Sequence, residues 1–170
     1  MQLRTHLLAI LLAGFACMSA QAQNAQAELQ AAAQAHQQGD AVKAFNHLNK
    51  AAQTGDPVAA YNLSVAYGNG DGTAVNQQAA LQWLQQSAQA GYPPAQYDLA
   101  MYYLSTGQAQ QAAPWMQALA DNGDAAAQFN YGIMLMRGDG VAANAKNGKA
   151  YIQKAAAQGF PPARQYLQQQ

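Results

Sequence analysis

Four related phrases decide how this chain folds: KAAQTG at 50–55, SAQAG at 87–91, ALADNG at 118–123 and KAAAQG at 154–159. Each is a stretch of small residues that ends in glycine, and the glycines are separated by 36, 32 and 36 residues. Spacing of this kind indicates an array of stacked helical units, because one unit cannot bury its apolar face alone. The phrases predict units at 24–55, 56–91, 92–123 and 124–159, followed by a C-terminal capping helix at 160–170.

Each unit is predicted to contain two antiparallel helices. The first helix starts at an Asp or Pro signal, as at Asp56-Pro57 and Asp124, because Asp caps free N–H groups and Pro fits the first turn. The second helix ends at the repeated glycine, which suits the left-handed position after a helix. A Gly-Asp-Gly loop joins the two helices of the long units, whereas Gly39 or Gly107 alone makes the turn in the short units.

Small and bulky residues recur at matched positions of the predicted helices. Small side chains let two helix axes approach closely, and bulky side chains fill the space between units. The small positions are Ser64, Ala100 and Gly132 in the first helices and Ala44, Ala80, Ala112 and Gly148 in the second helices. The bulky position holds His47, Trp83, Trp115 and Tyr151.

Pro114 interrupts this pattern, because it falls inside the predicted second helix of the third unit. A proline at an interior position removes one backbone hydrogen bond and clashes with the preceding turn. We therefore expect this helix to start late or to bend.

The segment 1–22 has the pattern of a secretory signal peptide. Arg4 precedes an apolar run at 7–18 that is too short to span a bilayer, and a small-residue triplet suited to cleavage ends at Ala22. Cleavage after Ala22 would make the protein periplasmic or secreted and would remove its only cysteine, Cys17. Acylation of Cys17 is disfavoured, because Gly14 occupies the position where a lipoprotein signal has an aliphatic residue.

Composition and charge exclude several classes of partner. Eight basic and eight acidic residues cancel, so the chain has no net field that would attract nucleic acid or an anionic membrane. Charged residues make up only 9% of the chain, and 27 glutamines supply much of its polar surface. After signal cleavage, no stable membrane insertion is expected.

The residues also predict that the protein is not an enzyme and needs no cofactor or metal. The chain has no nucleophile elbow and no phosphate-binding glycine loop, and Glu28 is its only glutamate. His36 and His47 lie eleven residues apart without a cysteine or a carboxylate nearby in sequence, which is not ligand spacing. Asp71 and Asp139 each give one carboxylate to a loop, which is too few for Ca²⁺.

Three motif blocks in a fixed order resemble the Sel1-like repeat (SLR) family, a close relative of the tetratricopeptide repeat. In the second unit these blocks are YNLS at 61–64, the Gly-Asp-Gly loop at 70–72 and ALQW at 80–83, and residues 127–156 repeat the same frame. The resemblance covers nearly all of 24–170. It implies an all-α fold, a right-handed α-solenoid of antiparallel helix pairs with a concave face lined by the first helices.

The concave face is the predicted site for a protein or peptide partner. In tetratricopeptide relatives, the polar residue before the Leu-small pair often holds a partner's backbone or carboxylate, and neighbouring apolar groups would cover its side chains. The corresponding residues are Tyr61, Asn62, Val65, Tyr97, Asp98, Met101, Phe129, Asn130 and Ile133. Asp98 departs from amide chemistry and would repel a carboxylate. The alternative is that these side chains only pack between repeats.

The leading functional prediction is a periplasmic or secreted repeat scaffold that mediates protein–protein or peptide binding. One alternative is a protein that binds or hydrolyses peptidoglycan fragments. The analogy for that alternative comes from family members with a cysteine pair in every repeat, which this chain does not have. Another alternative is a structural subunit of an envelope complex.

Overall fold

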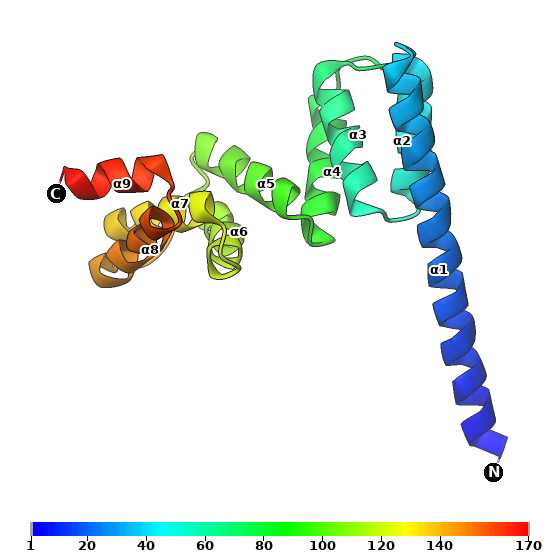
Figure 1. The fold of residues 1–170 in the computed structure, drawn as a ribbon, viewed down its shortest axis with the longest axis horizontal. Helices are drawn as coiled ribbons and strands as arrows, with labels where there is room; N and C mark the ends of the chain where they lie inside the picture. The colour runs from blue at the N-terminus through cyan, green and yellow to red at the C-terminus, as the bar shows by residue number, and fades with distance from the viewer. Residues whose placement is uncertain (1, 170) are drawn as a thin grey trace. The chain divides into compact units, whose positions relative to one another are not determined.

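The computed structural model describes the backbone of residues 2–169 and the side chains of residues 20–169. Within this part, the chain forms nine α-helices and no strand (Figure 1). The helices are α1 (Gln2–Gln37), α2 (Ala41–Gln53), α3 (Pro57–Asn69), α4 (Gln77–Gln89), α5 (Pro93–Ser105), α6 (Ala109–Asp121), α7 (Ala125–Arg137), α8 (Ala145–Ala157) and α9 (Pro161–Gln168). The all-α prediction is therefore confirmed. The predicted signal peptide, with Cys17, falls almost entirely on residues whose side chains lie outside the described part.

The chain divides into two compact units, residues 1–90 and 91–170. The N-terminal unit contains α1 to α4, and the C-terminal unit contains α5 to α9. Helices α2, α3, α4 and α5 recur in the same order and at the same spacing as α6, α7, α8 and α9, two repeats later. Ala41, which begins α2, thus corresponds to Ala109, which begins α6. Residues related by this two-repeat interval are equivalent, and each serves as an internal reference for the other.

Helix ends are defined by the caps and glycines that the sequence predicts. Asp56 and Asp124 cap α3 and α7, and their Oδ1 atoms accept backbone hydrogen bonds of 2.8 and 2.7 Å from Ala59 and Ala127. The glycines that close the four repeats have φ values from +88° to +96°, in the left-handed region where a side chain would be strained. Caps and closing glycines therefore fix these helix ends.

Of the two outcomes expected for the helix that contains Pro114, a late start or a bend, the late start is wrong. Helix α6 begins at Ala109 and continues through Pro114 to Asp121. Pro114 and Gln110 are both exposed, so water can hydrate the Gln110 carbonyl that has no N–H donor at Pro114. The first turn is tightened by a 2.9 Å hydrogen bond from the Gln111 N–H to the Gln108 carbonyl.

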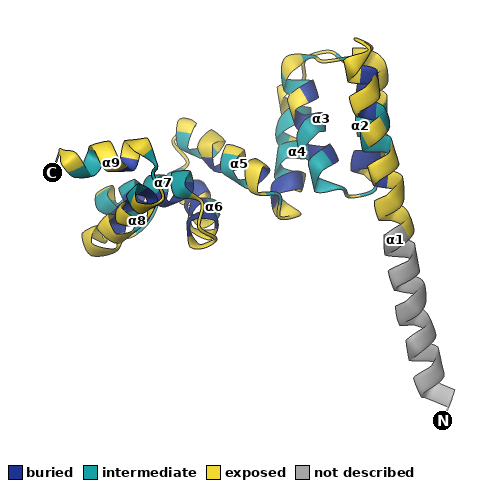
Figure 2. Ribbon diagram, in the orientation of Figure 1, coloured by how far each residue is buried: buried dark blue, intermediate teal, exposed yellow. Residues whose placement is uncertain are grey.

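Small residues allow the helices of a repeat to pack closely, as α7 and α8 show. A Cβ atom on Gly132 would lie 2.7 Å from Ile152 Cγ1 and 2.9 Å from the Gly148 carbonyl oxygen. A Cβ atom on Gly148 would lie 2.7 Å from the Gly132 carbonyl oxygen. The backbones of α7 and α8 therefore approach so closely that neither position has room for a methyl group. Figure 2 shows that the buried residues of each unit lie where its helices face one another.

Helix α9 covers the end of the C-terminal unit. Its Ala163 is fully buried, and Tyr166 and Leu167 pack against the cluster that contains Ile152. The Phe129 ring of α7 lies in the same cluster, with its centroid 6.2 Å from that of Tyr166. α9 therefore buries apolar groups of α7 and α8 that would otherwise face solvent.

Polar side chains tie neighbouring helices together in both units. Glu28 Oε2 of α1 lies 2.6 Å from His47 Nδ1 of α2, and the hydrogen bond with His47 lowers the pKa of Glu28. The Tyr151 hydroxyl of α8 donates to Asp121 at the end of α6, and this bond raises the pKa of Tyr151 to about 12. His47 therefore has a carboxylate partner that the sequence reasoning missed.

The α7–α8 contact gives a stability prediction. Gly132→Ala should lower the free energy of unfolding by about 1–3 kcal/mol, because the new methyl group overpacks the contact. Overpacking should outweigh the roughly 1 kcal/mol by which alanine favours a helix over glycine. Urea unfolding followed by circular dichroism measures the change. Gly68→Ala in α3 is the matched control, since its Cβ would meet only Ala80 Cβ at 4.0 Å. This control should be neutral or stabilising, and a Gly132→Ala protein as stable as wild type would contradict the prediction.

The Glu28–His47 bond predicts a pH dependence. The pKa of Glu28 in the folded chain lies below its ordinary value of 4.5. Its stabilising contribution is therefore present above that ordinary value and is lost as the pH falls through the folded-state pKa. Glu28→Gln should lower the melting temperature at about pH 7, and its difference from wild type should shrink toward about pH 3. Asp139→Asn, which changes an exposed loop carboxylate, should show no such trend. An equal difference for Glu28→Gln at both pH values would be evidence against the bond.

Candidate binding groove

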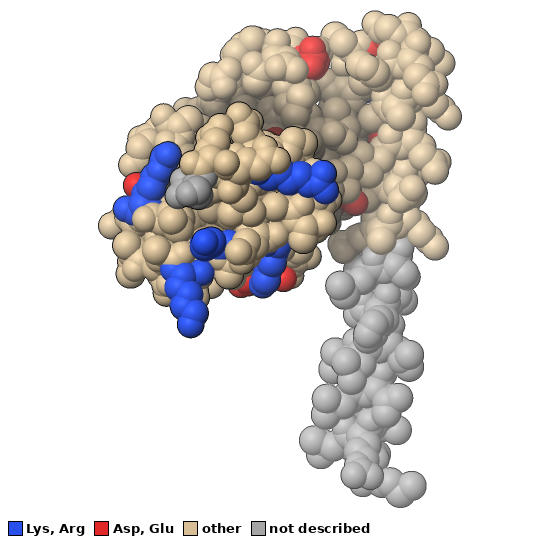
Figure 3. All heavy atoms as spheres, turned by 60° about the vertical axis from the view of Figure 1, so that its left-hand side comes forward, with Lys and Arg blue, Asp and Glu red and all other residues tan. Residues whose placement is uncertain are grey.

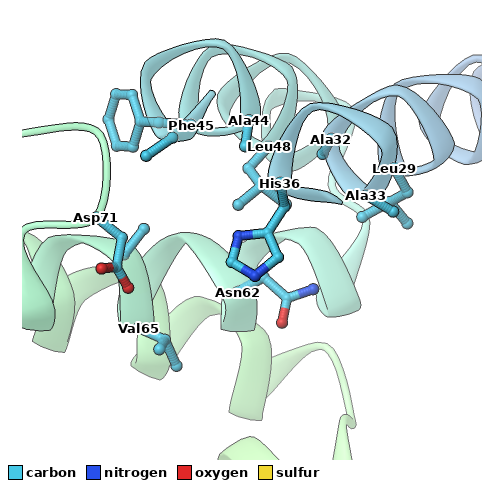
Figure 4. Close-up of a pocket in the computed structure, with 12 residues that line it drawn as sticks. Leu29, Ala32, Ala33, His36, Ala44, Phe45, Leu48, Asn62, Val65 and Asp71 are labelled. Carbon is cyan, nitrogen blue, oxygen red and sulfur yellow. The ribbon is translucent and has the colours of Figure 1, made fainter. Parts of the chain in front are cut away.

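The N-terminal unit contains a groove lined by α1, α2, α3 and the loop after α3 (Figure 4). We name it the α1–α3 groove, and its volume is about 300 Å³. Most of its lining is apolar, with three polar side chains among the apolar ones. The lining residues are Leu29, Ala32, Ala33, His36, Ala41, Ala44, Phe45, Leu48, Asn62, Val65, Ala66 and Asp71.

Two of the positions on α1 that line this hollow hold smaller residues than their equivalents in the C-terminal unit. The repeat positions that hold Tyr97 and Met101 in α5 hold Leu29 and Ala33 in α1, two repeats earlier. Leucine lacks the ring and hydroxyl of tyrosine, and alanine leaves the space that a methionine side chain would fill. The same backbone plan therefore leaves an open space on α1 where α5 carries larger groups.

A hydrogen bond in the C-terminal unit shows what the groove lacks. The Asn130 Nδ2 atom of α7 donates to the Tyr97 hydroxyl of α5 at 3.0 Å, which links these two helices. The N-terminal equivalents are Asn62 and Leu29, and leucine cannot accept this bond. The amide of Asn62 therefore lines the groove and is not bonded to the helix opposite.

Three polar side chains give the groove its chemistry. His36 comes from α1, Asn62 from α3, and Asp71 from the loop after α3. Figure 4 shows the imidazole of His36 reaching from α1 toward α3, on the side where Asn62 lies. Asp71 Oδ2 accepts a 3.3 Å hydrogen bond from Asn69. A few polar groups in a mostly apolar groove fix the orientation of a bound segment.

The walls of the groove are held by two local contacts. The Glu28–His47 pair joins α1 to α2 beside the lining residues Leu29 and Leu48. Gly72 rests on the start of α2 so closely that a Cβ atom there would lie 2.1 Å from the Ala41 carbonyl oxygen. This approach, at a φ of +73°, requires glycine and fixes the loop that carries Asp71.

The structure places the predicted site residues in different surroundings. Asn62 and Val65 line the groove, with Val65 42% exposed, and Tyr61 of α3 is half-buried. On α5, Met101 is 40% exposed and Asp98 is exposed.

The remaining four predicted residues contribute to packing within the C-terminal unit. Tyr97 and Asn130 bond to each other. Phe129 and Ile133 pack against the cluster that α9 covers. These side chains therefore make the inter-repeat contacts that the alternative interpretation described.

Sequence reasoning missed the contribution of α1 and α2 to the groove. Leu29, Ala33 and His36 of α1 and Phe45 and Leu48 of α2 were not among the predicted site residues. A comparison of 25–37 with 93–105 contains part of the signal, since the first helix has smaller residues than its equivalent at several positions, Leu29 and Ala33 among them.

Among the described residues, no group of three or more His, Cys, Asp and Glu side chains is arranged to hold a metal ion. None of the helices in this part of the chain combines the length and apolar character needed to cross a membrane.

Comparison with known proteins identifies the repeat. The model of the Sel1 repeat matches residues 25–56, 57–92, 93–124 and 125–160, each starting one residue after the predicted unit. No curated protein sequence matches the chain.

Solved structures have the same fold. A Sel1 repeat protein from Oxalobacter formigenes is 31% identical with a TM-score of 0.79, over 88% of this chain and 46% of that one. The protective antigen c5321 of uropathogenic Escherichia coli, which displays an SLR fold, is 31% identical with a TM-score of 0.69, over 85% of this chain and 33% of that one. MamA from Desulfovibrio magneticus, at 23% identity and a TM-score of 0.51 over 82% of this chain and 76% of that one, shares the fold alone.

This chain thus spans less than half the length of the first two similar structures. The four matched repeats nevertheless cover most of its residues, and they coincide with the helix pairs of the structure. The chain belongs to the Sel1 repeat family.

Proposed function

We propose that this protein is a periplasmic or secreted scaffold that binds a peptide segment of a partner protein in the α1–α3 groove. Repeats of this family generally form scaffolds for protein–protein interaction and are generally not catalytic. The observation that carries the proposal is the open groove itself. It lies where the equivalent helices of the C-terminal unit are linked by the Tyr97–Asn130 bond.

The lining suggests how a peptide would bind. An apolar side chain of the peptide would enter the hollow over Ala33 and contact Leu48 and Val65. Burial of one such side chain contributes about 1.5–3 kcal/mol. The amide of Asn62 can both donate to and accept from the peptide backbone, which gives the segment a direction. Several apolar contacts with one directional polar group suit a short peptide segment.

Filling the hollow tests this proposal. The double variant Leu29→Tyr/Ala33→Met installs the residues that α5 has at the equivalent positions. Peptides would first be selected on the wild-type chain from a random displayed library, and their affinities would then be measured by fluorescence anisotropy. We expect the double variant to bind them at least about tenfold more weakly, because the space for the apolar side chain is gone.

The control for this experiment is Met101→Ala, which changes an exposed apolar residue of α5 and should leave peptide affinity unchanged. Melting temperatures of both variants should stay close to that of wild type. The double variant carries residues that α5 has at the equivalent positions, and Met101→Ala changes a solvent-exposed position. Selected peptides that bind the filled variant with wild-type affinity would refute the groove, as would a library that yields no binder.

Export is the second part of the proposal, and it rests on the signal-peptide pattern of the segment 1–22. All residues that line the groove follow Ala22, so cleavage there would leave the site intact. We expect the mature protein from bacterial cells to begin at Gln23, as read by mass spectrometry of its N-terminal peptide. Recovery of only the uncleaved chain, confined to the cytoplasmic fraction, would contradict export.

A further inference from the structure

Basic residues of the described part are concentrated at its C-terminal end. Five of its seven lysine and arginine side chains lie between residues 137 and 164, where Asp139 is the only acidic residue. These five residues, named the basic face, are Arg137, Lys146, Lys149, Lys154 and Arg164. The balanced charge of the whole chain conceals this local excess.

The charges of the basic face are available to a partner. All five side chains are exposed, and within residues 20–169 none forms a salt bridge with a carboxylate. Lys154 Nζ lies 5.0 Å from the centroid of the Tyr151 ring, and Arg164 Nε donates to the Ala156 carbonyl at 3.1 Å. Neither of these contacts is made with a carboxylate; the carboxylate of Asp121 accepts from the hydroxyl of the same Tyr151. Figure 3 shows lysine and arginine side chains gathered on the face of the C-terminal unit that is turned toward the viewer.

The repeat itself does not require these charges. Four of the five equivalent positions, two repeats earlier, hold uncharged amides, and the fifth holds leucine. In the order of the basic face, the equivalents are Asn69, Gln78, Leu81, Gln86 and Gln96. Because helices at equivalent places form with either set, the cations are a feature of the surface and not of the fold.

We propose that the basic face docks on a lipid bilayer that contains anionic phospholipid. The strongly exposed large apolar residues of the described part lie outside 137–164, so this face has no apolar anchor for shape-specific recognition of a protein. Long cationic side chains on α7, α8 and α9 can instead each approach a separate phosphate group of a uniformly charged plane. Each such cation strengthens binding about fivefold.

Nucleic acid fits these observations less well than a bilayer. The C-terminal unit has five basic and four acidic residues, a net charge of +1, whereas nucleic-acid-binding domains are strongly basic overall. The proposal concerns peripheral attachment through charge, and it does not depend on the α1–α3 groove.

Vesicle co-sedimentation with the full chain tests the proposal. Two vesicle types are compared: phosphatidylcholine alone, and equal parts of phosphatidylcholine and phosphatidylglycerol. The apolar run at 7–18 can contribute to both types, so the difference between them is the measurement. We expect at least about tenfold stronger binding to the anionic vesicles at roughly 0.05 M salt, and loss of this preference at roughly 0.5 M.

The decisive variant replaces four cations by their internal equivalents: Arg137→Asn, Lys146→Gln, Lys154→Gln and Arg164→Gln. It should fold like wild type, as a circular dichroism melt will show, and should lose the preference for anionic vesicles. The control Lys43→Gln/Lys50→Gln, which removes two cations of α2, should keep it. An equal preference in the four-residue variant would overturn the proposal. Tighter binding to duplex DNA than to anionic vesicles would overturn it in favour of nucleic acid.

Discussion

The fold depends on the close approach of helices at positions where only a small side chain fits. Alanines at one position of four successive first helices, Ala59, Ala95, Ala127 and Ala163, are all fully buried. A larger group there would push the helices apart, and packing at native density does not tolerate such overfilling. Since charged residues make up only 9% of the chain, this packing takes a large share in holding the repeats together. The surface of each helix is therefore free to vary while the contacts inside the repeat stay the same.

That constraint explains what could be predicted from the sequence. Caps, closing glycines and small positions act within a few residues, so their spacing was enough to predict stacked helix pairs, and the motif blocks carried the resemblance to the Sel1 repeat family. The late start of the helix at Pro114, one of the two expected outcomes, was wrong because the rule counts a lost hydrogen bond and ignores hydration of an exposed carbonyl. The Glu28 partner of His47 was missed because it lies 19 residues away on another helix. Contacts between helices depend on their relative rotation, which periodicity does not reveal.

The candidate site was predicted only in part for a related reason. A prediction from the repeat pattern treats equivalent positions as equal. It therefore assigned Phe129 and Ile133 to the predicted binding face together with Tyr61 and Val65. In the structure α9 covers the last repeat, and Phe129 and Ile133 pack against the cluster that α9 covers. The groove is lined at several positions where equivalents differ, among them Leu29 and Ala33. In a repeat protein the shared positions report the fold, and the differences between equivalents are the better guide to function.

The two units differ in how the equivalent helices α1 and α5 are bonded to their neighbours. α5 is bonded to α7 through Tyr97 and Asn130, whereas α1 lacks the equivalent bond to α3 and is tied to α2 through Glu28 and His47. The side-chain hydrogen bond of α1 is thus made to α2, while Leu29 packs against the apolar cluster that α2 and α3 share. A bound segment can lie between α1 and α3 without breaking a bond that the folded chain needs, which is the arrangement a binding groove requires. In the C-terminal unit the corresponding space is bridged, and the distinctive chemistry lies on the outer surface in its unpaired cations.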